Sequence, residues 1–407
     1  MTVNSLMTQL SMPTFTASAE LDLQFFNSLY LYNGTYRTNL ANVPGWSFSR
    51  TDTNGTATAL DLAGNIIQFA TGVPRITNRG ILVEEARTNS FEQTGLPNFW
   101  VVTASQNGLT GTIVGTGTEN GMPYQEVRAV GTATSTFFDF GDMGSGFRTA
   151  ATSGQTFTGG CGAKIISGAG SVTGLSVTLV EESAGNVFVG QTITQFPVVN
   201  GVFNRVSSTR TMGATAATCR LARVITFSPG DAVDITVRFY LPQLEQGAFA
   251  TSPIITTGAA GTRGADAGRI TQSPTASGTI IATVRIPTDK NNRRVAGTNG
   301  TSGVTPLAYS TAGIETYNGS STLGKTVSMA AGELVTVGVT WESGRRSVTG
   351  AGLAVATDAN SIGSFTEMWF GQDDSLLAGN ALNESIVRVQ VLPYAVTDAQ
   401  LQALTAP

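Results

Sequence analysis

The residues best suited to acid–base chemistry gather at one place in the sequence, at Glu84, Glu85 and Arg87. Side chains of adjacent strand residues point to opposite faces, so Glu84 and Glu85 are not expected to form a catalytic dyad. Two interpretations remain open for the cluster. It is either a salt bridge that docks one domain or subunit on another, or a local pair worth about 0–1 kcal/mol in water. Glu181 and Glu182 are adjacent as well, and the same reason excludes them as a dyad.

Histidine is absent from the whole chain of 407 residues. This absence excludes Ser-His-Asp and Cys-His nucleophilic catalysis, and zinc sites built on imidazole. Polysaccharide hydrolysis requires only two carboxylates about 5–10 Å apart, and the 27 acidic residues leave room for such a pair. No Glu-x-Asp-x-Glu motif is present, and we expect the chain not to be an enzyme.

Four aspartates lie beside glycines, in the segments DFGDMGSG and GQDDS. They are Asp139, Asp142, Asp373 and Asp374. A structural calcium ion takes six to eight oxygen ligands from loop carboxylates and carbonyls, but this spacing matches no defined calcium loop. Aspartate as a turn former is the alternative. We therefore expect no cofactor and leave the metal content open.

Exposed aromatic rings would be the platform for a sugar, because the apolar face of a pyranose stacks on a π face. The candidates for carbohydrate binding are Trp100, Tyr124, Tyr309, Tyr317 and Trp369. Packing in a core is the alternative for each of them. Alternation along a strand predicts that one of Trp369 and Phe370 points outward.

The charge balance bears on partners and compartment. Lys and Arg total 23 and Asp and Glu total 27, a net charge of −4, whereas a nucleic-acid-binding surface would be strongly basic.

The first basic residue is Arg37, so the N-terminus lacks the basic region of a signal peptide. No apolar run approaches the length of a membrane span. We expect a chain made in a cytoplasm, soluble there, with Cys161 and Cys219 as buried reduced thiols; a disulfide between neighbouring strands is the alternative.

Short alternating runs separated by turn residues predict an all-β protein built from β-sandwiches or jelly rolls. In residues 231–241, Val233, Ile235, Val237, Phe239 and Leu241 share one face. In 334–341 that face holds Val335, Val337, Val339 and Trp341, and in 385–392 it holds Val387, Val389 and Val391. A hydrophobic period of two residues predicts a strand with one buried face and one solvent-exposed face, as in antiparallel sheets.

One short helix is predicted at the C-terminus. Thr397 can be its N-cap and Gln400 the third helical residue, which makes a capping box. Val396 can then pack against Leu401, while Leu401 and Leu404 face inward. A helix of about two turns does not form alone in water, so it must dock on a sheet.

Composition divides the chain into four regions. Residues 1–90 are turn-rich and predict an extended, irregular N-terminal region for attachment or oligomerisation. Residues 91–250 predict a jelly roll, 251–277 a Gly/Ala/Thr-rich linker, and 278–407 a second β-sandwich that ends in the helix. The N-terminal region exposes too much apolar surface for a free arm, so we expect another subunit or a particle to cover it. The apolar residues are Leu21, Leu23, Phe25, Phe26, Leu29, Tyr30 and Tyr32.

Three stretches resemble a recurring architecture of tailed-bacteriophage virion appendage proteins. Residues 48–89 contain FSRTDTNGTATALDLAGNI and GVPRITNRGILVEEARTN, the most specific match. Residues 240–266, YLPQLEQGAFATSPIITTGAAGTRGAD, resemble the end of a carbohydrate-binding-module-like jelly roll, with Gly264 where that pattern has Ala. Residues 387–405, VRVQVLPYAVTDAQLQALT, are similar to the last strand and closing helix of a laminin-G/concanavalin-A-like sandwich.

The resemblance implies a structural component of a tailed-phage virion, assembled in the host cytoplasm. Such an appendage, a tail fibre or spike, would attach to the particle through its N-terminal region and bind host-surface glycan. Its partners would be other virion proteins and copies of itself, with a homotrimer as the default, and neither nucleic acid nor an inserted membrane. Two alternatives remain: a head-decoration, head-fibre or collar protein without a receptor role, and a capsular polysaccharide depolymerase.

Overall fold

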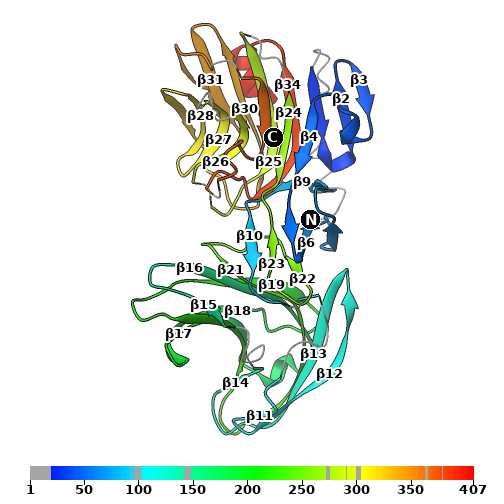
Figure 1. The fold of residues 1–407 in the computed structure, drawn as a ribbon, viewed down its shortest axis with the longest axis vertical. Coiled ribbons are helices and arrows are strands. Elements are labelled where there is room, and N and C mark those ends of the chain that lie inside the picture. Colours follow the sequence, from blue (N-terminus) through cyan, green and yellow to red (C-terminus); the bar gives the residue numbers. More distant parts are fainter. Residues whose placement is uncertain are drawn as a thin grey trace.

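The computed structural model describes residues 20–92, 94–95, 102–141, 148–271, 276–289, 291–298, 304–362, 365–377 and 379–407. Figure 1 shows two β lobes joined by a narrow junction of short strands. The prediction of an all-β sandwich protein with a short C-terminal helix is confirmed. Among the described residues, none of the helices has the length and apolar composition that crossing a membrane requires.

The C-terminal lobe consists of a ten-stranded sheet facing a seven-stranded sheet. The first has the path β3 (Thr35–Arg37), β2 (Leu29–Tyr32), β1 (Leu21–Gln24), β34 (Glu384–Leu392), β25 (Gly278–Arg285), β30 (Leu334–Glu342), β31 (Arg345–Gly350) and β32 (Ala356–Asp358), with β9 (Gly80–Val83) on β34 and β8 (Arg75–Thr77) on β9. The second has the order β29 (Thr322–Thr326), β28 (Gly313–Asn318), β27 (Val304–Ser310), β26 (Arg293–Thr298), β33 (Glu367–Phe370), β24 (Ala267–Thr271) and β4 (Trp46–Ser49). Short 3-10 turns follow β1 (η1, Phe25–Asn27) and precede β4 (η2, Leu40–Asn42).

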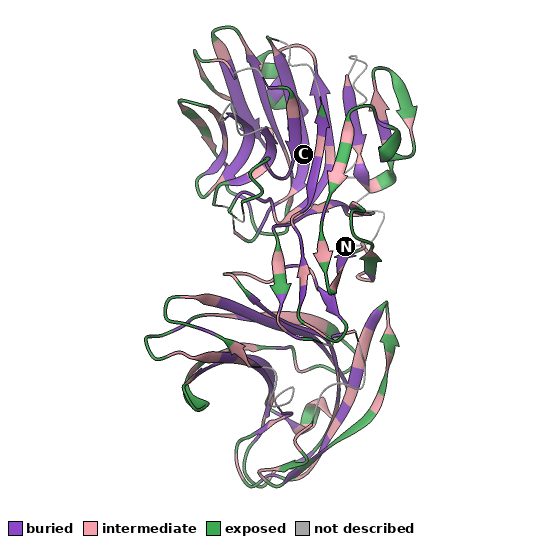
Figure 2. Ribbon diagram, viewed as in Figure 1, coloured by how far each residue is buried: buried purple, intermediate pink, exposed green. Residues whose placement is uncertain are grey.

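The central lobe is a sandwich of six and five strands with a separate apolar core. Its first sheet has the order β11 (Ser105–Gln106), β12 (Leu109–Glu119), β13 (Met122–Thr132), β21 (Ala232–Gln246), β16 (Thr156–Ser167) and β19 (Phe203–Thr211). Its second has β14 (Phe137–Asp139), β20 (Thr218–Thr226), β17 (Gly174–Ser183) and β18 (Val187–Gln195), with β15 (Thr149–Ala150) also on β20 and the short turn η3 (Ala169–Ser171) before β17. Figure 2 shows the buried residues concentrated on the strands of each lobe.

The junction is made of two three-stranded sheets. One is β10 (Arg87–Asn89), β23 (Gly261–Arg263) and β5 (Asp52–Thr53), and the other is β22 (Ile255–Thr256), β6 (Gly55–Leu60) and β7 (Ile66–Phe69). Segment 251–277, expected to be a linker, supplies β22 and β23 here and β24 to the C-terminal lobe. The difference arises because small residues let the backbone pack closely, and Arg263 and Asp266 in this segment are fully buried.

The N-terminal strands belong to the C-terminal lobe, and the expectation of an irregular, externally covered segment is corrected. β1 pairs antiparallel with β34, with Leu23 opposite Val389. Leu21, Leu23 and Phe25 are buried in the same core as the strands of residues 278–392. The apolar residues therefore already have a cover within their own chain. Local pattern could not show it, because the partner strand lies more than 360 residues away in sequence.

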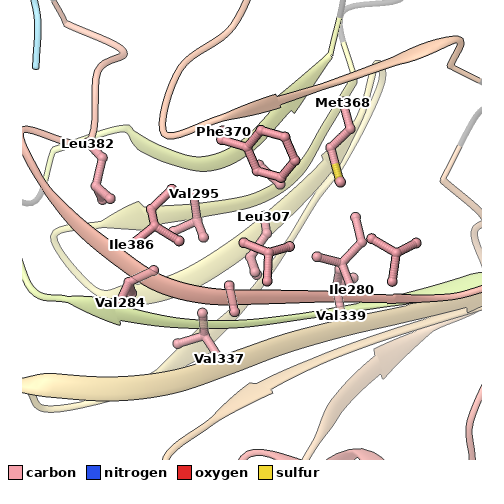
Figure 3. Close-up of a cluster of buried hydrophobic side chains, with 14 of the residues drawn as sticks. Ile280, Val284, Val295, Leu307, Val337, Val339, Met368, Phe370, Leu382 and Ile386 are labelled. Atoms are coloured by element: carbon pink, nitrogen blue, oxygen red, sulfur yellow. The ribbon is translucent and has the colours of Figure 1, made fainter. Parts of the chain in front are cut away.

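The predicted alternation is confirmed where the strands are regular and fails at two bulges. Val335, Val337 and Val339 line the core of the C-terminal lobe together with Ile280 and Phe370 (Figure 3).

On β34 the register with β25 passes from Arg388 to Ile386, so Ile386 joins the core in place of Val387. On β21 the register with β16 shifts near Leu241, whose φ is 39°. Leu241 consequently packs in a small cluster at the junction, away from the main core of the central lobe.

The C-terminal helix α2 (Asp398–Leu404) matches its prediction in detail. The Thr397 side chain accepts a hydrogen bond from the backbone of Gln400, and the Gln400 side chain completes the capping box. Val396, Leu401 and Leu404 form a separate apolar cluster on the outer face of the ten-stranded sheet. Docking on the sheet provides the burial that a two-turn helix lacks on its own.

A candidate binding site at the junction of the two lobes

A buried network of charged residues fills the junction. Arg75, on β8, donates from Nη1 to Glu84 Oε2 at 2.6 Å and forms a second ion pair, through Nη2, with Asp266. Arg50 Nη1 lies 3.2 Å from Asp266 Oδ1, and Arg263 Nη1 lies 3.1 Å from Glu84 Oε2. The side chains of these five residues are almost completely buried. Each buried charge therefore has an opposite charge in contact, which is the condition for burying it at all.

Glu84 is the centre of this network. Burial by itself would raise the pKa of its carboxyl, but the guanidinium groups of Arg263 and Arg75 and hydrogen bonds from Ser252 lower that pKa to about 2. Ser252 donates from its backbone N at 2.7 Å and from its hydroxyl at 2.6 Å. The carboxyl is thus ionised and fully occupied by structural contacts.

Glu85 contacts the C-terminal lobe next to this network, and Arg87 pairs with Glu85. Glu85 forms ion pairs with Arg87 and, at 3.3 Å, with Arg293 of β26. The guanidinium groups of Arg87 and Arg293 lie 5.0 and 5.4 Å from the ring of Phe249. Asn383, before β34, donates from Nδ2 to Glu85 Oε2. Glu84 and Glu85 lie in the segment between β9 and β10, outside the strand that the sequence led us to expect, and they turn to different partners.

The sequence did not single out Arg50, Arg75, Arg263 and Asp266 as site residues. They lie in the quoted stretches FSR, VPR and TRGAD. The sequence therefore contained these residues in notable stretches but did not show that they contact one another. Residues up to 216 positions apart meet in this network. Only the tertiary structure shows that the stretches form one cluster.

Beside the network lies a hollow of about 380 Å³, which we call the interlobe pocket. Its walls come from the junction, from β19 of the central lobe and from the loops before β26 and β34 of the C-terminal lobe. The lining side chains that can bind a ligand through hydrogen bonds or charge are Thr77, Arg79, Glu84, Arg205, Ser207, Thr251, Ser252, Thr288, Asp289, Asn383, Glu384 and Ser385. Within the described part of the chain, the hydroxyls of Ser207, Thr288 and Ser385 have no hydrogen-bond partner.

A second hollow, of about 620 Å³, is lined in part by Arg87. Threonine and serine hydroxyls dominate its lining, with Phe157 as the one aromatic residue among those that line it. Phe157 is itself buried in the core of the central lobe. The hollow therefore offers no exposed ring on which a sugar could stack.

The aromatic candidates for sugar binding are not brought together. Tyr309 is fully buried in the core of the C-terminal lobe, so it has no surface to offer a ligand. Trp369 lies outside the main core, unlike Phe370, but it is only 6% exposed. Arg269 lies 5.1 Å from the Trp369 ring, and Trp369 Nε1 donates to Glu367 at 3.2 Å. Tyr317 is half-buried on β28. Trp100 lies outside the described residues.

Tyr124 belongs to a polar cluster on the outer face of the six-stranded sheet. The guanidinium of Arg238 lies 4.3 Å from its ring. Glu119 accepts hydrogen bonds from Tyr240 and Lys164, each at 2.6 Å, and from Arg238 at 3.0 Å. Hydrogen bonds from Lys164 and Tyr240 lower the pKa of Glu119 to about 2. Since one face of Tyr124 is covered by Arg238, only the remainder of the half-buried ring is open.

Two of the aspartates considered for calcium, Asp139 and Asp373, interact with other side chains of the protein. Asp373 lies 3.4 Å from Arg294 and accepts from Asn380, and Asp139 lies 3.6 Å from Arg220. Asp374 is exposed beside Asp373, and Asp142 is outside the described residues. In the described ranges no group of three or more acidic or cysteine side chains could hold a metal ion.

Both cysteines are free and buried, as the sequence predicts. Cys161 lies on β16 and Cys219 on β20, within the core of the central lobe. Burial raises the pKa of Cys161 to about 11 and that of Cys219 to about 12. We expect a thiol reagent at neutral pH to leave the native protein unlabelled and to modify both cysteines after unfolding in guanidinium. Rapid labelling of the native protein, or a mass change on reduction, would contradict this expectation.

Comparison with known proteins gives structural matches alone. No family model and no curated protein matches the chain. The CBM40 module of a Ruminococcus gnavus sialidase, bound to α2,3-sialyllactose, is 21% identical over 33% of this chain and 84% of that chain, with a TM-score of 0.27. The baseplate tripod of bacteriophage Tuc2009 is 12% identical over 78% and 98%, with a TM-score of 0.27. A Trypanosoma rangeli sialidase is 16% identical over 34% and 26%, with a TM-score of 0.28, so the match spans about a quarter of that enzyme.

The expectation that the chain is not an enzyme is corrected by these matches. Sialidases recur among the matched structures, at 10–16% identity. Similarity to known structures therefore does not separate this chain from enzymes, and the exclusion of catalysis does not stand. At these identities and TM-scores the matches assign neither an activity nor a ligand.

Proposed function

We propose that the protein is a structural, glycan-binding component of a tailed-phage particle. The observation that carries the glycan part is the interlobe pocket. Its volume of about 380 Å³ falls within the usual range for ligand pockets, about 300–1,000 Å³. Hydroxyl, amide and charged side chains converge in it, and such a lining suits a ligand rich in hydroxyl groups.

The phage part of the proposal rests on the resemblance of the three sequence stretches. The buried charge network supports a structural role, because it fixes the junction between two separate cores. Contact with the particle through the N-terminal region would use the outer surface of β2 and β3, where Tyr36 is 60% exposed.

The direct test is to locate the protein on the particle with a labelled antibody and to screen the purified chain on a glycan array. We expect label at the tail or its tip and binding of glycans on the array. Label on the capsid or collar without glycan binding would favour a head-decoration or collar protein. Release of reducing sugar from host capsule would favour a depolymerase.

Self-association is part of the same proposal, with a homotrimer as the expected state. An apolar strip lies along β18 and the segment that leads into β19, and residues 183–204 carry no charged side chain. Its exposed members are Val187, Phe188, Val189, Ile193, Val199, Val202 and Phe203. β18 is the last strand of its sheet, and an uncharged apolar edge strand favours pairing with another chain.

Replacing Phe188, which is 59% exposed, by aspartate is expected to convert the oligomer to a monomer. The new charge would have to be buried without a partner in the interface. Light scattering coupled to size exclusion gives the mass. Leu377→Asp is the matched control, because Leu377 is 61% exposed outside the strip, and it should leave the oligomer intact. A monomeric wild type, or an oligomeric Phe188→Asp variant, would contradict the assignment.

A further inference from the structure

The charges that line the interlobe pocket do not balance within the protein. Two of its three carboxylates are already paired: Glu84 contacts Arg75 and Arg263, and Asp289 pairs with Arg293. All three of these arginines lie outside the pocket lining. Neither Glu84 nor Asp289 is therefore available to neutralise a cation inside the pocket.

Two arginines of the lining have no ion pair among the described residues. Arg79 lies in the turn between β8 and β9, and its guanidinium makes no hydrogen bond to the described part of the chain. Arg205, on β19, donates from Nη1 to the carbonyl oxygen of Leu241 at 2.8 Å. A carbonyl oxygen satisfies a donor without neutralising the positive charge.

Glu384 is the remaining carboxyl group of the lining. Its Oε2 accepts a hydrogen bond from the backbone N of Ser385 at 2.8 Å, and it forms no ion pair within the described residues. Burial raises its pKa, although Arg79 and Arg285 act in the opposite direction. The lining thus holds two guanidinium groups without an ion pair, Arg79 and Arg205, and one carboxyl without an ion pair, Glu384, which leaves an excess of positive charge among the lining side chains.

We propose that the interlobe pocket binds a saccharide unit that carries a carboxylate, with Arg79 as the ion-pair partner of that carboxylate. The inference rests on the proposed glycan-binding function and names the class of sugar. A guanidinium offers paired donors that match a carboxylate. The free hydroxyls of Ser207, Thr288 and Ser385 and the carboxyl of Glu384 are the groups available for the sugar hydroxyls.

Titration calorimetry on the full chain with three probes tests the chemistry. D-glucuronate carries both parts of the proposed ligand, D-glucose lacks the carboxylate, and acetate lacks the sugar. We expect glucuronate to bind at least tenfold more tightly than either of the others. Equal binding of glucose would overturn the role of the carboxylate, and equal binding of acetate would overturn the role of the sugar.

The variant Arg79→Gln tests the residue. Because hydrogen bonds between a guanidinium and a carboxylate are stronger than those between neutral groups, we expect glucuronate affinity to fall at least tenfold and glucose affinity to stay unchanged. Arg79 is half-buried and its side chain makes no hydrogen bond to the residues that the structure describes, so the variant should fold. Arg37→Gln is the matched control, since Arg37 also lacks an ion pair in the described residues and lies outside the pocket.

The outcomes separate this inference from the proposed function. Neutral glycans bound on the array, together with unchanged glucuronate affinity in Arg79→Gln, would overturn the inference and leave glycan binding intact. Failure of every saccharide, on the array and in the calorimeter, would overturn glycan binding itself and the inference with it.

Discussion

Replacing Arg75 by methionine is expected to lower the free energy of unfolding by about 3–5 kcal/mol, as is usual when one partner of a buried ion pair is removed. Arg75 is fully buried and contacts both Glu84 and Asp266. Methionine fills much of the space but leaves two carboxylates with fewer compensating charges. Urea denaturation followed by circular dichroism measures the change.

Arg128→Met is the control for this variant. Arg128 also pairs with an aspartate, Asp234, at 2.7 Å, but the two side chains are 44% and 56% exposed. Exposed pairs contribute about 0–1 kcal/mol, so the free energy of unfolding of the control should be close to that of the wild type. Equal effects of the two substitutions would show that the junction network is hydrated and does not hold the lobes together.

Phe25→Ala is expected to destabilise the C-terminal lobe by about 3–5 kcal/mol, the usual range for removing a buried phenylalanine ring. Phe25 is fully buried, and its ring centroid lies 6.0 Å from that of Tyr30, 6.4 Å from that of Trp46 and 6.3 Å from that of Phe370. The substitution leaves a cavity between the N-terminal strands and the sandwich. Tryptophan fluorescence during urea unfolding measures the loss of stability of this lobe.

The two cores make this prediction specific to one lobe. Phe25 lies in the core of the C-terminal lobe, and no residue of the central core belongs to that cluster. The transition of the central lobe should therefore shift less than that of the C-terminal lobe. Tyr36→Ala on the exposed side of β3 is the control and should change stability by less than about 0.5 kcal/mol. An unchanged transition in Phe25→Ala would mean that the N-terminal segment does not pack on the sandwich.

The consequence for function is that the N-terminal strands β1 to β4 are part of the sandwich. Arg388 of β34 donates from Nε to Asp22 at 2.7 Å, and Gln390 of the same strand donates to Asp22 as well. Polar contacts thus support the apolar packing of β1. Attachment to a particle would have to use surfaces that this packing leaves exposed.

The class of fold and the local elements follow from patterns along the amino-acid sequence. Period-two alternation fixes which face of a regular strand is buried, and Val335, Val337 and Val339 lie in the core as that pattern predicts. The capping box of Thr397 and Gln400 was equally visible, because its hydrogen bonds join residues three positions apart. The burial of both cysteines followed from their apolar character.

The way in which these elements combine depends on contacts between distant parts of the chain. The bulges at Leu241 and Val387 arise from pairing with another strand, so alternation along one strand cannot show them. Arg75, Glu84 and Asp266 meet across as many as 191 positions, and the interlobe pocket takes its walls from both lobes. Contacts of this kind depend on how distant strands pair. Short-range periodicity records which face of a strand avoids water and contains no information about which strand will cover it.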